Sequence, residues 1–167
     1  ALGYRRIRGR FIEGTTPAVA GALLATLNTG SEFGFGAVIA ALPGFLVVRD
    51  ALGAIPNPLV SAAISTTTLA GITGSASGGL SIALSALGGQ FISTAHAAGI
   101  PLEVMHRVVA MASGGMDVLP HNGAVITVLA VTGLTHRQSY GDIFVLALIK
   151  TSAVFVVIAL YYATGMV

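Results

Sequence analysis

The chain has 167 residues, of which 54% are hydrophobic and only 8% charged, and its formal net charge is +2. Because an ordinary soluble domain carries roughly 25% charged residues, a water-facing surface made from this sequence would expose apolar patches that aggregate. The lack of an Arg/Lys stripe argues against binding to nucleic acid, and the absence of cysteine excludes disulfides and thiolate metal sites. We therefore expect an all-α, polytopic membrane protein.

The first predicted segment, residues 1–13, is basic and holds the arginines Arg5, Arg6, Arg8 and Arg10. Arginine clusters beside a hydrophobic stretch are typical of cytoplasmic loops in membrane proteins. A solvated basic tail is the alternative, and both interpretations place the segment outside the hydrocarbon.

Residues 15–50 are apolar around a polar, glycine-rich stretch at residues 28–36. A helix through residues 15–48 would be about 51 Å long, well above the roughly 30 Å of a bilayer core. We therefore expect a broken span, interrupted at residues 28–36. Arg49 and Asp50 end the segment in water.

Residues 57–98 form two apolar arms around a small, polar stretch at residues 73–79. Each arm has about 15–20 residues, enough for a short span or for one limb of a re-entrant hairpin. The polar tip favours a re-entrant helical hairpin, because non-helical backbone survives at membrane depth only where protein or water satisfies it. Hydropathy alone leaves two full spans as the alternative.

A second broken span is expected at residues 103–134. Its interruption, residues 113–123, contains three glycines, a proline and two ionisable groups. Residues 135–141 form a polar turn before a final span at residues 142–165, which is about 36 Å of helix. Lys150 in this last span is expected to face the helix bundle or to extend toward the interface.

The broken helices are the main functional signal in the sequence. Each break exposes N–H groups that attract anions and C=O groups that attract cations, and two glycine-interrupted segments are typical of a transporter's binding site. Close helix packing explains any single Gly/Ser pair equally well, but three interruptions in one chain favour a substrate site. The residues expected to bind substrate are Asn28, Thr29, Ser31, Ser75, Ser77, Gly78, Gly79, Ser113, Gly114, Gly115 and Asn122.

Three ionisable residues in the breaks, Asp117, His121 and Glu32, are candidates for proton coupling. Ionisable groups at membrane depth are costly and usually mark transport pathways or proton relays. Histidine titrates near neutral pH, and a buried aspartate can carry a proton. Glu32 has an alternative role as the cap of a half-helix that begins near Phe33.

The enzyme motifs G-x-S-x-G and H-E-x-x-H and the phosphate-binding P-loop are absent from the sequence. An intramembrane hydrolase that uses Ser113 or Ser77 with His121 is one alternative function. A channel-like or structural membrane subunit is another. Asp117 and His121 lack enough partners for a metal site, and we expect no cofactor.

Three stretches of the sequence carry a family resemblance. Residues 111–127 (MASGGMDVLPHNGAVIT) with residues 129–136 (LAVTGLTH) resemble the gluconate permease family. Residues 27–36 (LNTGSEFGFG) and 72–79 (ITGSASGG) are similar to two further segments of that family. The similarity extends over nearly the whole chain and corresponds to the family's C-terminal part.

The resemblance implies a proton-coupled symporter for gluconate or a related hydroxy acid in the bacterial inner membrane. Members of the family carry gluconate, other sugar acids, D-serine or hydroxybutyrate, so the family does not fix the substrate. Since the chain begins without Met and offers few spans, we expect a piece of a longer transporter. Its expected partners are the N-terminal half, the bilayer, a small organic acid and a coupling proton, with a homo-oligomer as an open alternative.

Overall fold

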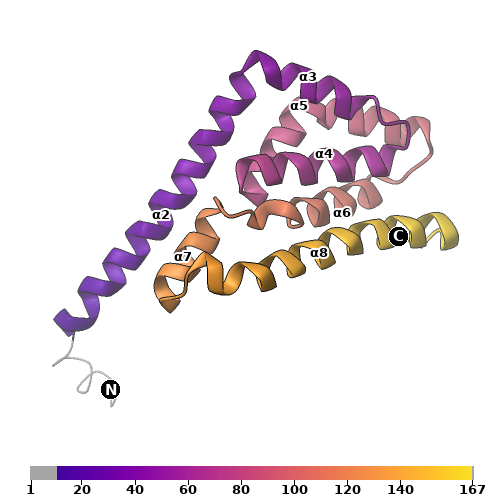
Figure 1. Cartoon of the computed structure of the whole chain (residues 1–167). Coiled ribbons are helices and arrows are strands. Elements are labelled where there is room, and N and C mark those ends of the chain that lie inside the picture. The colour runs from indigo at the N-terminus through magenta and orange to yellow at the C-terminus, as the bar shows by residue number, and fades with distance from the viewer. Residues whose placement is uncertain (1–10, 167) are drawn as a thin grey trace.

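The computed structural model describes residues 11–166, apart from the side chains of residues 12, 13, 32, 33 and 40. All regular structure in this part is helical, which confirms the all-α expectation, while Arg5, Arg6, Arg8 and Arg10 lie outside the described residues. The helices, drawn in Figure 1, are α2 (Phe11–Ala41), α3 (Pro43–Gly53), α4 (Pro58–Thr73), α5 (Ala76–Ala97), α6 (Leu102–Ser113), the short 3-10 helix η1 (Met116–Val118), α7 (Gly123–Thr132) and α8 (His136–Thr164).

Helices α4 and α5 form a tightly connected pair of neighbours. Helix α4 ends at Gly74, whose φ of 63° is left-handed and suits glycine. The next residue, Ser75, caps α5, because its Oγ accepts a hydrogen bond from the Gly78 N–H at 3.2 Å. The two arms expected at residues 57–98 therefore fall on two helices joined by a two-residue turn. Insertion of this pair as a re-entrant hairpin stays a prediction.

Gly79 brings the backbones of α4 and α5 into direct contact. A Cβ atom at residue 79 would lie 2.2 Å from Ala70 Cα and 2.3 Å from Ala70 N, far inside van der Waals contact. Glycine is therefore required here for packing, as in other close helix pairs.

The largest buried cluster lies where α4, α5, α6 and α8 meet. Helix α6 packs against α4 and α5, and α8 runs alongside α6 (Figure 1). Helices α4, α5 and α6 contribute Leu59, Phe91 and Val108 to this cluster. Helix α8 contributes Val154 and Ile158. The many van der Waals contacts of such side chains fix α8 against the other three helices.

Helix α2 runs without a break through residues 28–36, so the interruption predicted there is wrong. Glycine and asparagine each cost at most about 1 kcal/mol in a helix interior, which a packed helix tolerates. The break lies instead at Leu42, whose ψ of 139° is extended because a residue before proline avoids the helical region. Helices α2 and α3 are bent by 84° at this point. The segment 15–50 therefore bends at Pro43 and not at its polar stretch, while α2 continues through Pro17.

The continuity of α2 also removes the capping role considered for Glu32. A cap would require a helix to begin near Phe33, whereas residues 32 and 33 both lie inside α2. The Glu32 side chain itself is outside the described residues, and its role in proton coupling stays a prediction.

The second break is present where the sequence predicted it. Helix α6 ends at Ser113, and helix resumes at Gly123 with η1 between them. The polar residues 135–141, expected as a turn, instead form the first turns of α8. Gln138 Oε1 accepts a hydrogen bond from the Thr135 N–H at 2.9 Å, which satisfies one free donor at the helix start.

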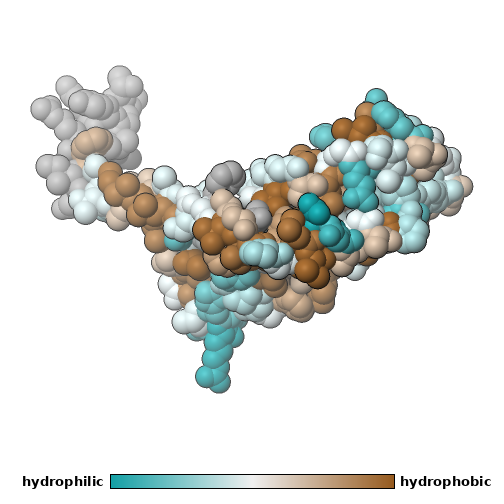
Figure 2. Space-filling view, turned by 90° about the horizontal axis from the view of Figure 1, so that it is seen from above, coloured by the Kyte–Doolittle hydropathy of each residue, from teal (hydrophilic) through white to brown (hydrophobic). Residues whose placement is uncertain are grey.

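Helix α8 is the one helix in the described part that is long and apolar enough to cross a membrane by itself. Helices α2 and α3 meet the same test only as a bent pair, while α4 and α7 have 16 and 10 residues. Length and composition thus indicate one or two spans, and a polytopic arrangement stays a prediction. Apolar side chains are nevertheless exposed along α2 and α8, and Figure 2 shows such residues across the face seen from above.

We predict that Gly79→Ala destabilises the fold, whereas Gly89→Ala in the same helix does not. The first change places a methyl group against the α4 backbone, and overpacking of this kind costs about 1–3 kcal/mol. Gly89 has no atom within 4 Å of an added Cβ, so alanine there only improves helix propensity. Thermal unfolding of the two purified variants checks this, and equal midpoints would contradict the close approach of α4 and α5.

Candidate functional site

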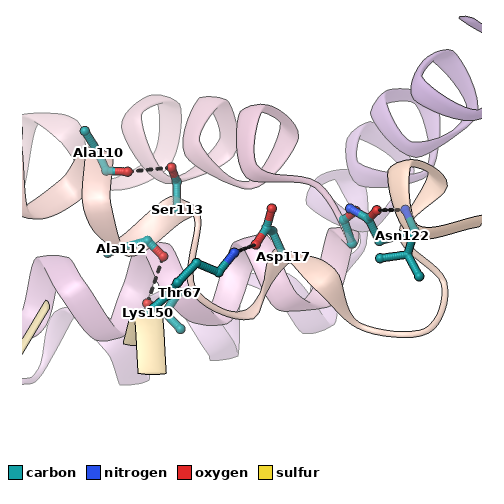
Figure 3. Close-up of polar contacts among 9 residues, drawn as sticks. Thr67, Ala110, Ala112, Ser113, Asp117, Asn122 and Lys150 are labelled. Atoms are coloured by element: carbon teal, nitrogen blue, oxygen red, sulfur yellow. Dashed lines mark hydrogen bonds and ion pairs between the residues drawn. The ribbon is translucent and has the colours of Figure 1, made fainter. Parts of the chain in front are cut away.

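The two helix breaks expected at residues 73–79 and 113–123 meet in the structure. Asn122, buried just before α7, donates from Nδ2 to the Gly74 carbonyl oxygen at 2.6 Å. Its Oδ1 accepts from the Val125 N–H at 2.6 Å and so caps α7 (Figure 3). One amide therefore satisfies an orphan carbonyl at the end of α4 and an orphan N–H at the start of α7.

His121 contacts the same turn of α4. Its Nε2 lies 3.2 Å from the Ile72 carbonyl oxygen, and the ring is exposed on its other side. A Cβ at Gly74 would lie 2.6 Å from His121 Cδ2, so the ring fills the space that the glycine leaves. The start of α8 joins this region, because His136 Nε2 lies 3.0 Å from the Pro120 carbonyl oxygen.

Helix α2 brings the third predicted segment to the same place, although it is unbroken. Asn28 Nδ2 donates to Thr127 Oγ1 at 3.1 Å and to the Gly123 carbonyl oxygen at 3.4 Å. A Cβ at Gly36 would lie 3.1 Å from Thr73 Cγ2, so α2 passes close to the end of α4. These two hydrogen bonds satisfy the Asn28 amide donor while the residue stays within helix α2.

An open hollow of about 390 Å³ lies between α2, the end of α4 and the start of α7. Its size falls in the lower part of the range of small-molecule sites, roughly 300–1,000 Å³. Three predicted site residues, Asn28, Ser31 and His121, line it, whereas Thr29 does not. The complete lining is Asn28, Ser31, Phe35, Ile72, Thr73, His121, Gly123 and Ile126.

The small residues at the start of α5 have structural contacts of their own. Ser75 Oγ caps the helix through Gly78, and Gly79 packs against α4. Ser77 is exposed, and its Oγ lies 3.5 Å from Ser75 Oγ. None of these four residues lines the hollow beside α2, so packing and capping explain them as well as a binding role does.

The residues at the end of α6 are likewise engaged. Ser113 Oγ donates to the Ala110 carbonyl oxygen at 2.8 Å, and Thr67 Oγ1 donates to the Ala112 carbonyl oxygen at 3.0 Å (Figure 3). Gly114 follows as the C-terminal cap of α6. These contacts join α4 to the carbonyl end of α6.

The hydroxyls considered for a hydrolase do not meet the histidine. Ser113 bonds within α6, Ser77 lies beside Ser75, and His121 contacts the carbonyl of Ile72. The hydrogen bonds in the described part therefore form no Ser–His pair.

Asp117 has a partner that the sequence analysis did not assign. Its Oδ1 lies 3.4 Å from Lys150 Nζ on α8, as Figure 3 shows. The Asp117 side chain is 17% exposed and the Lys150 side chain 45% exposed. The signal was present in the sequence, since a lone cation in an apolar helix needs a counter-ion, but nothing in the spacing identified Asp117 as that partner.

We predict that Asn122→Ala disturbs the junction of the two breaks more than Asn122→Ser does. Alanine loses both bonds of the amide, whereas serine keeps an oxygen that can cap α7 and loses the amide donor to Gly74. An N-cap is worth about 1 kcal/mol, and an unsatisfied buried carbonyl costs about 1–3 kcal/mol. Thermal unfolding should rank wild type above the serine variant and that variant above alanine; a reversed ranking would contradict the double role of the amide.

The chain is similar to a curated protein of Bacillus subtilis (strain 168) that bears the name "Uncharacterized transporter YxjC". The two are 60% identical over 165 residues, which cover 98% of this chain and 35% of that protein. The chain thus spans about a third of the relative's length. No protein-family model matches the sequence, and no solved structure does. Membership of the gluconate permease family stays a prediction.

Proposed function

We propose that the chain is part of a secondary transporter that carries gluconate or a related small hydroxy acid into the bacterial cell together with a proton. The observation that carries the proposal is the convergence of residues 28–35, 72–73 and 121–126 around one hollow. The likeness to a protein named a transporter supports the same class of function.

The hollow offers the groups that a hydroxy acid needs. Asn28 and Ser31 supply an amide and a hydroxyl, which are suited to the hydroxyl groups of a sugar acid. The start of α7 also lines the hollow at Gly123, and a helix N-terminus carries a partial positive charge that favours a carboxylate. Phe35 and Ile126 supply apolar contact on the other side.

Proton coupling is assigned in this proposal to the break beside the hollow. Asp117 is largely sheltered and lies on η1, and His121 lies four residues further along the same break. Protonation of either group changes the charge beside the bound acid, which is the basis of proton-coupled transport. Glu32 is the third candidate in the proposal, on the helix that faces the hollow.

The proposal also includes a moving unit. We assign α4, α5 and the break at 113–123 to a unit that moves during transport, because polar contacts join them at the site. Helix α8, which is exposed and apolar along much of its length, would be a supporting helix. A channel would instead allow flux without accumulation, so uptake against a concentration gradient separates the two functions.

We predict that Asn28→Ala weakens uptake, whereas Thr26→Ala on the same helix does not. Asn28 lines the hollow, while the Thr26 hydroxyl donates to the Ala22 carbonyl oxygen of its own helix. Loss of one hydrogen bond to a charged substrate costs about 1.5–3 kcal/mol, or at least about tenfold in half-saturating concentration. The measurement is uptake of labelled gluconate, lactate and 3-hydroxybutyrate by the intact protein in proteoliposomes with an acidic exterior. Equal kinetics for both variants would remove the hollow from the proposal.

A second prediction concerns coupling. Asp117→Asn should abolish accumulation driven by a proton gradient and should leave exchange of labelled for unlabelled acid intact, because the amide cannot carry the proton. Asp50→Asn is the matched control, since Asp50 pairs with its neighbour Arg49 among the described residues. Accumulation by the Asp117 variant at the wild-type level would exclude Asp117 from coupling.

A further inference from the structure

Lys150 lies where a charge is least expected. It stands in the middle of α8 (His136–Thr164), and residues 143–164 contain no other charged side chain. A charge at bilayer depth is costly, and such residues pair with one another or mark a pathway. Lys150 therefore requires a counter-ion within the protein.

Asp117 is that counter-ion in the structure. The contact joins Nζ to a single carboxylate oxygen at 3.4 Å, and it is the one polar contact that the described part gives the ammonium. An ammonium group has three donors, so this pair leaves two of them available. The other ion pair in the described residues joins the neighbours Arg49 and Asp50. The Lys150–Asp117 pair is thus the ionic link between separate elements.

The position of Lys150 beside the break is fixed by the next residue, Thr151. A Cβ at Gly115 would lie 2.6 Å from Thr151 Oγ1, so only glycine lets α8 approach the break this closely. The Thr151 hydroxyl is itself buried without a hydrogen-bond partner. Gly115 therefore allows α8 to pack against η1, and this packing places Lys150 next to Asp117.

The pair has few charged neighbours that could replace either member. Helix α4, which packs against η1, contains no titratable side chain. Other titratable groups on α8 are at least eight residues from Lys150, about 12 Å along the helix. His121 in the same break contacts Ile72. The remaining titratable groups on α8 and on the neighbouring α6 are His136, Arg137, Tyr140, Asp142, Tyr161, Tyr162, Glu103, His106 and Arg107.

We propose that Lys150 is the counter-ion of the transported acid and that protonation of Asp117 releases it for this role. The inference rests on the proposed function. With Asp117 ionised, the two side chains are neutral together. A proton added to the Asp117 carboxylate gives a neutral carboxylic acid and leaves the ammonium with one uncompensated positive charge. A monocarboxylate that enters the site then restores neutrality, and its departure with the proton restores the original pair.

The start of α7 alone does not replace Lys150 in this scheme. A helix N-terminus supplies roughly half a positive charge, whereas a carboxylate carries a full negative one. The ion pair and the hollow share one break, because Asp117 and the hollow-lining His121 both lie between α6 and α7. The empty site with its ion pair and the site loaded with acid and proton therefore both avoid a net charge in a low-dielectric environment.

The scheme fixes the stoichiometry of transport. One proton enters with each monovalent acid, and no net charge crosses the membrane. If Asp117 is replaced by a residue that is always neutral, the empty site carries the positive charge of Lys150 permanently. Each acid that enters such a variant then carries one negative charge across the membrane without a proton.

The test uses the intact protein in proteoliposomes, with gluconate, lactate and 3-hydroxybutyrate as probes and with uptake measured at imposed membrane potentials. Wild-type uptake should not depend on the potential. Asp117→Asn should exchange acid at all pH values and become sensitive to the potential. Lys150→Met should reduce acid uptake at least a hundredfold, and Lys150→Arg should restore most of it. Arg49→Met, which breaks the other ion pair, should behave as wild type.

Folding is controlled by the double variant Asp117→Asn with Lys150→Met, which leaves no unpaired charge and should unfold near the wild-type temperature without transporting acid. If the wild type accumulates an acid, either of two results would overturn this inference and leave the proposed function standing. One is undiminished acid uptake by Lys150→Met, and the other is an electrical current that accompanies acid uptake by the wild type. Failure of the wild type to accumulate any of the three acids would overturn the proposed function and the inference with it.

Discussion

The structure depends on one hydrogen-bonding constraint, which is that every helix break must find partners for the backbone groups that it frees. The Asn122 side chain meets this constraint for two breaks at once, because it bonds to the Gly74 carbonyl oxygen and to the Val125 N–H. Without that amide, the end of α4 would face the start of α7 with an unpaired carbonyl. The junction of α4 and α7 is therefore where backbone polarity is concentrated in an otherwise apolar chain.

The other features of the candidate site follow from this junction. The left-handed Gly74 makes room for the His121 ring, and α2 reaches the same place through Asn28. The hollow between these elements combines the start of a helix with neutral polar side chains. Next to η1, the close approach of Gly115 to Thr151 places Lys150 beside Asp117. One broken helix thus connects the polar hollow to the ion pair.

Sequence reasoning predicted the features that depend on local chemistry. The glycines, Pro120 and the two ionisable residues of the segment 113–123 indicated a break, and one is present. The same reasoning failed at residues 28–36, because the partner that keeps Asn28 helical lies on α7, far away in the sequence. Pro43, which bends the chain, was overlooked among apolar residues. The Lys150–Asp117 pair could not be predicted either, since it depends on how α8 packs against η1.

The central claim is that a small acid occupies the hollow beside the junction, and substrate protection of Ser31→Cys tests it most directly. This chain contains no cysteine, so once any cysteines elsewhere in the intact protein are replaced, a thiol reagent reports on residue 31 alone. Gluconate or another transported acid should slow alkylation of Ser31→Cys and leave Ser93→Cys, which is exposed near the C-terminal end of α5, unaffected. An unchanged alkylation rate at residue 31, in a variant that still accumulates the acid, would contradict the account.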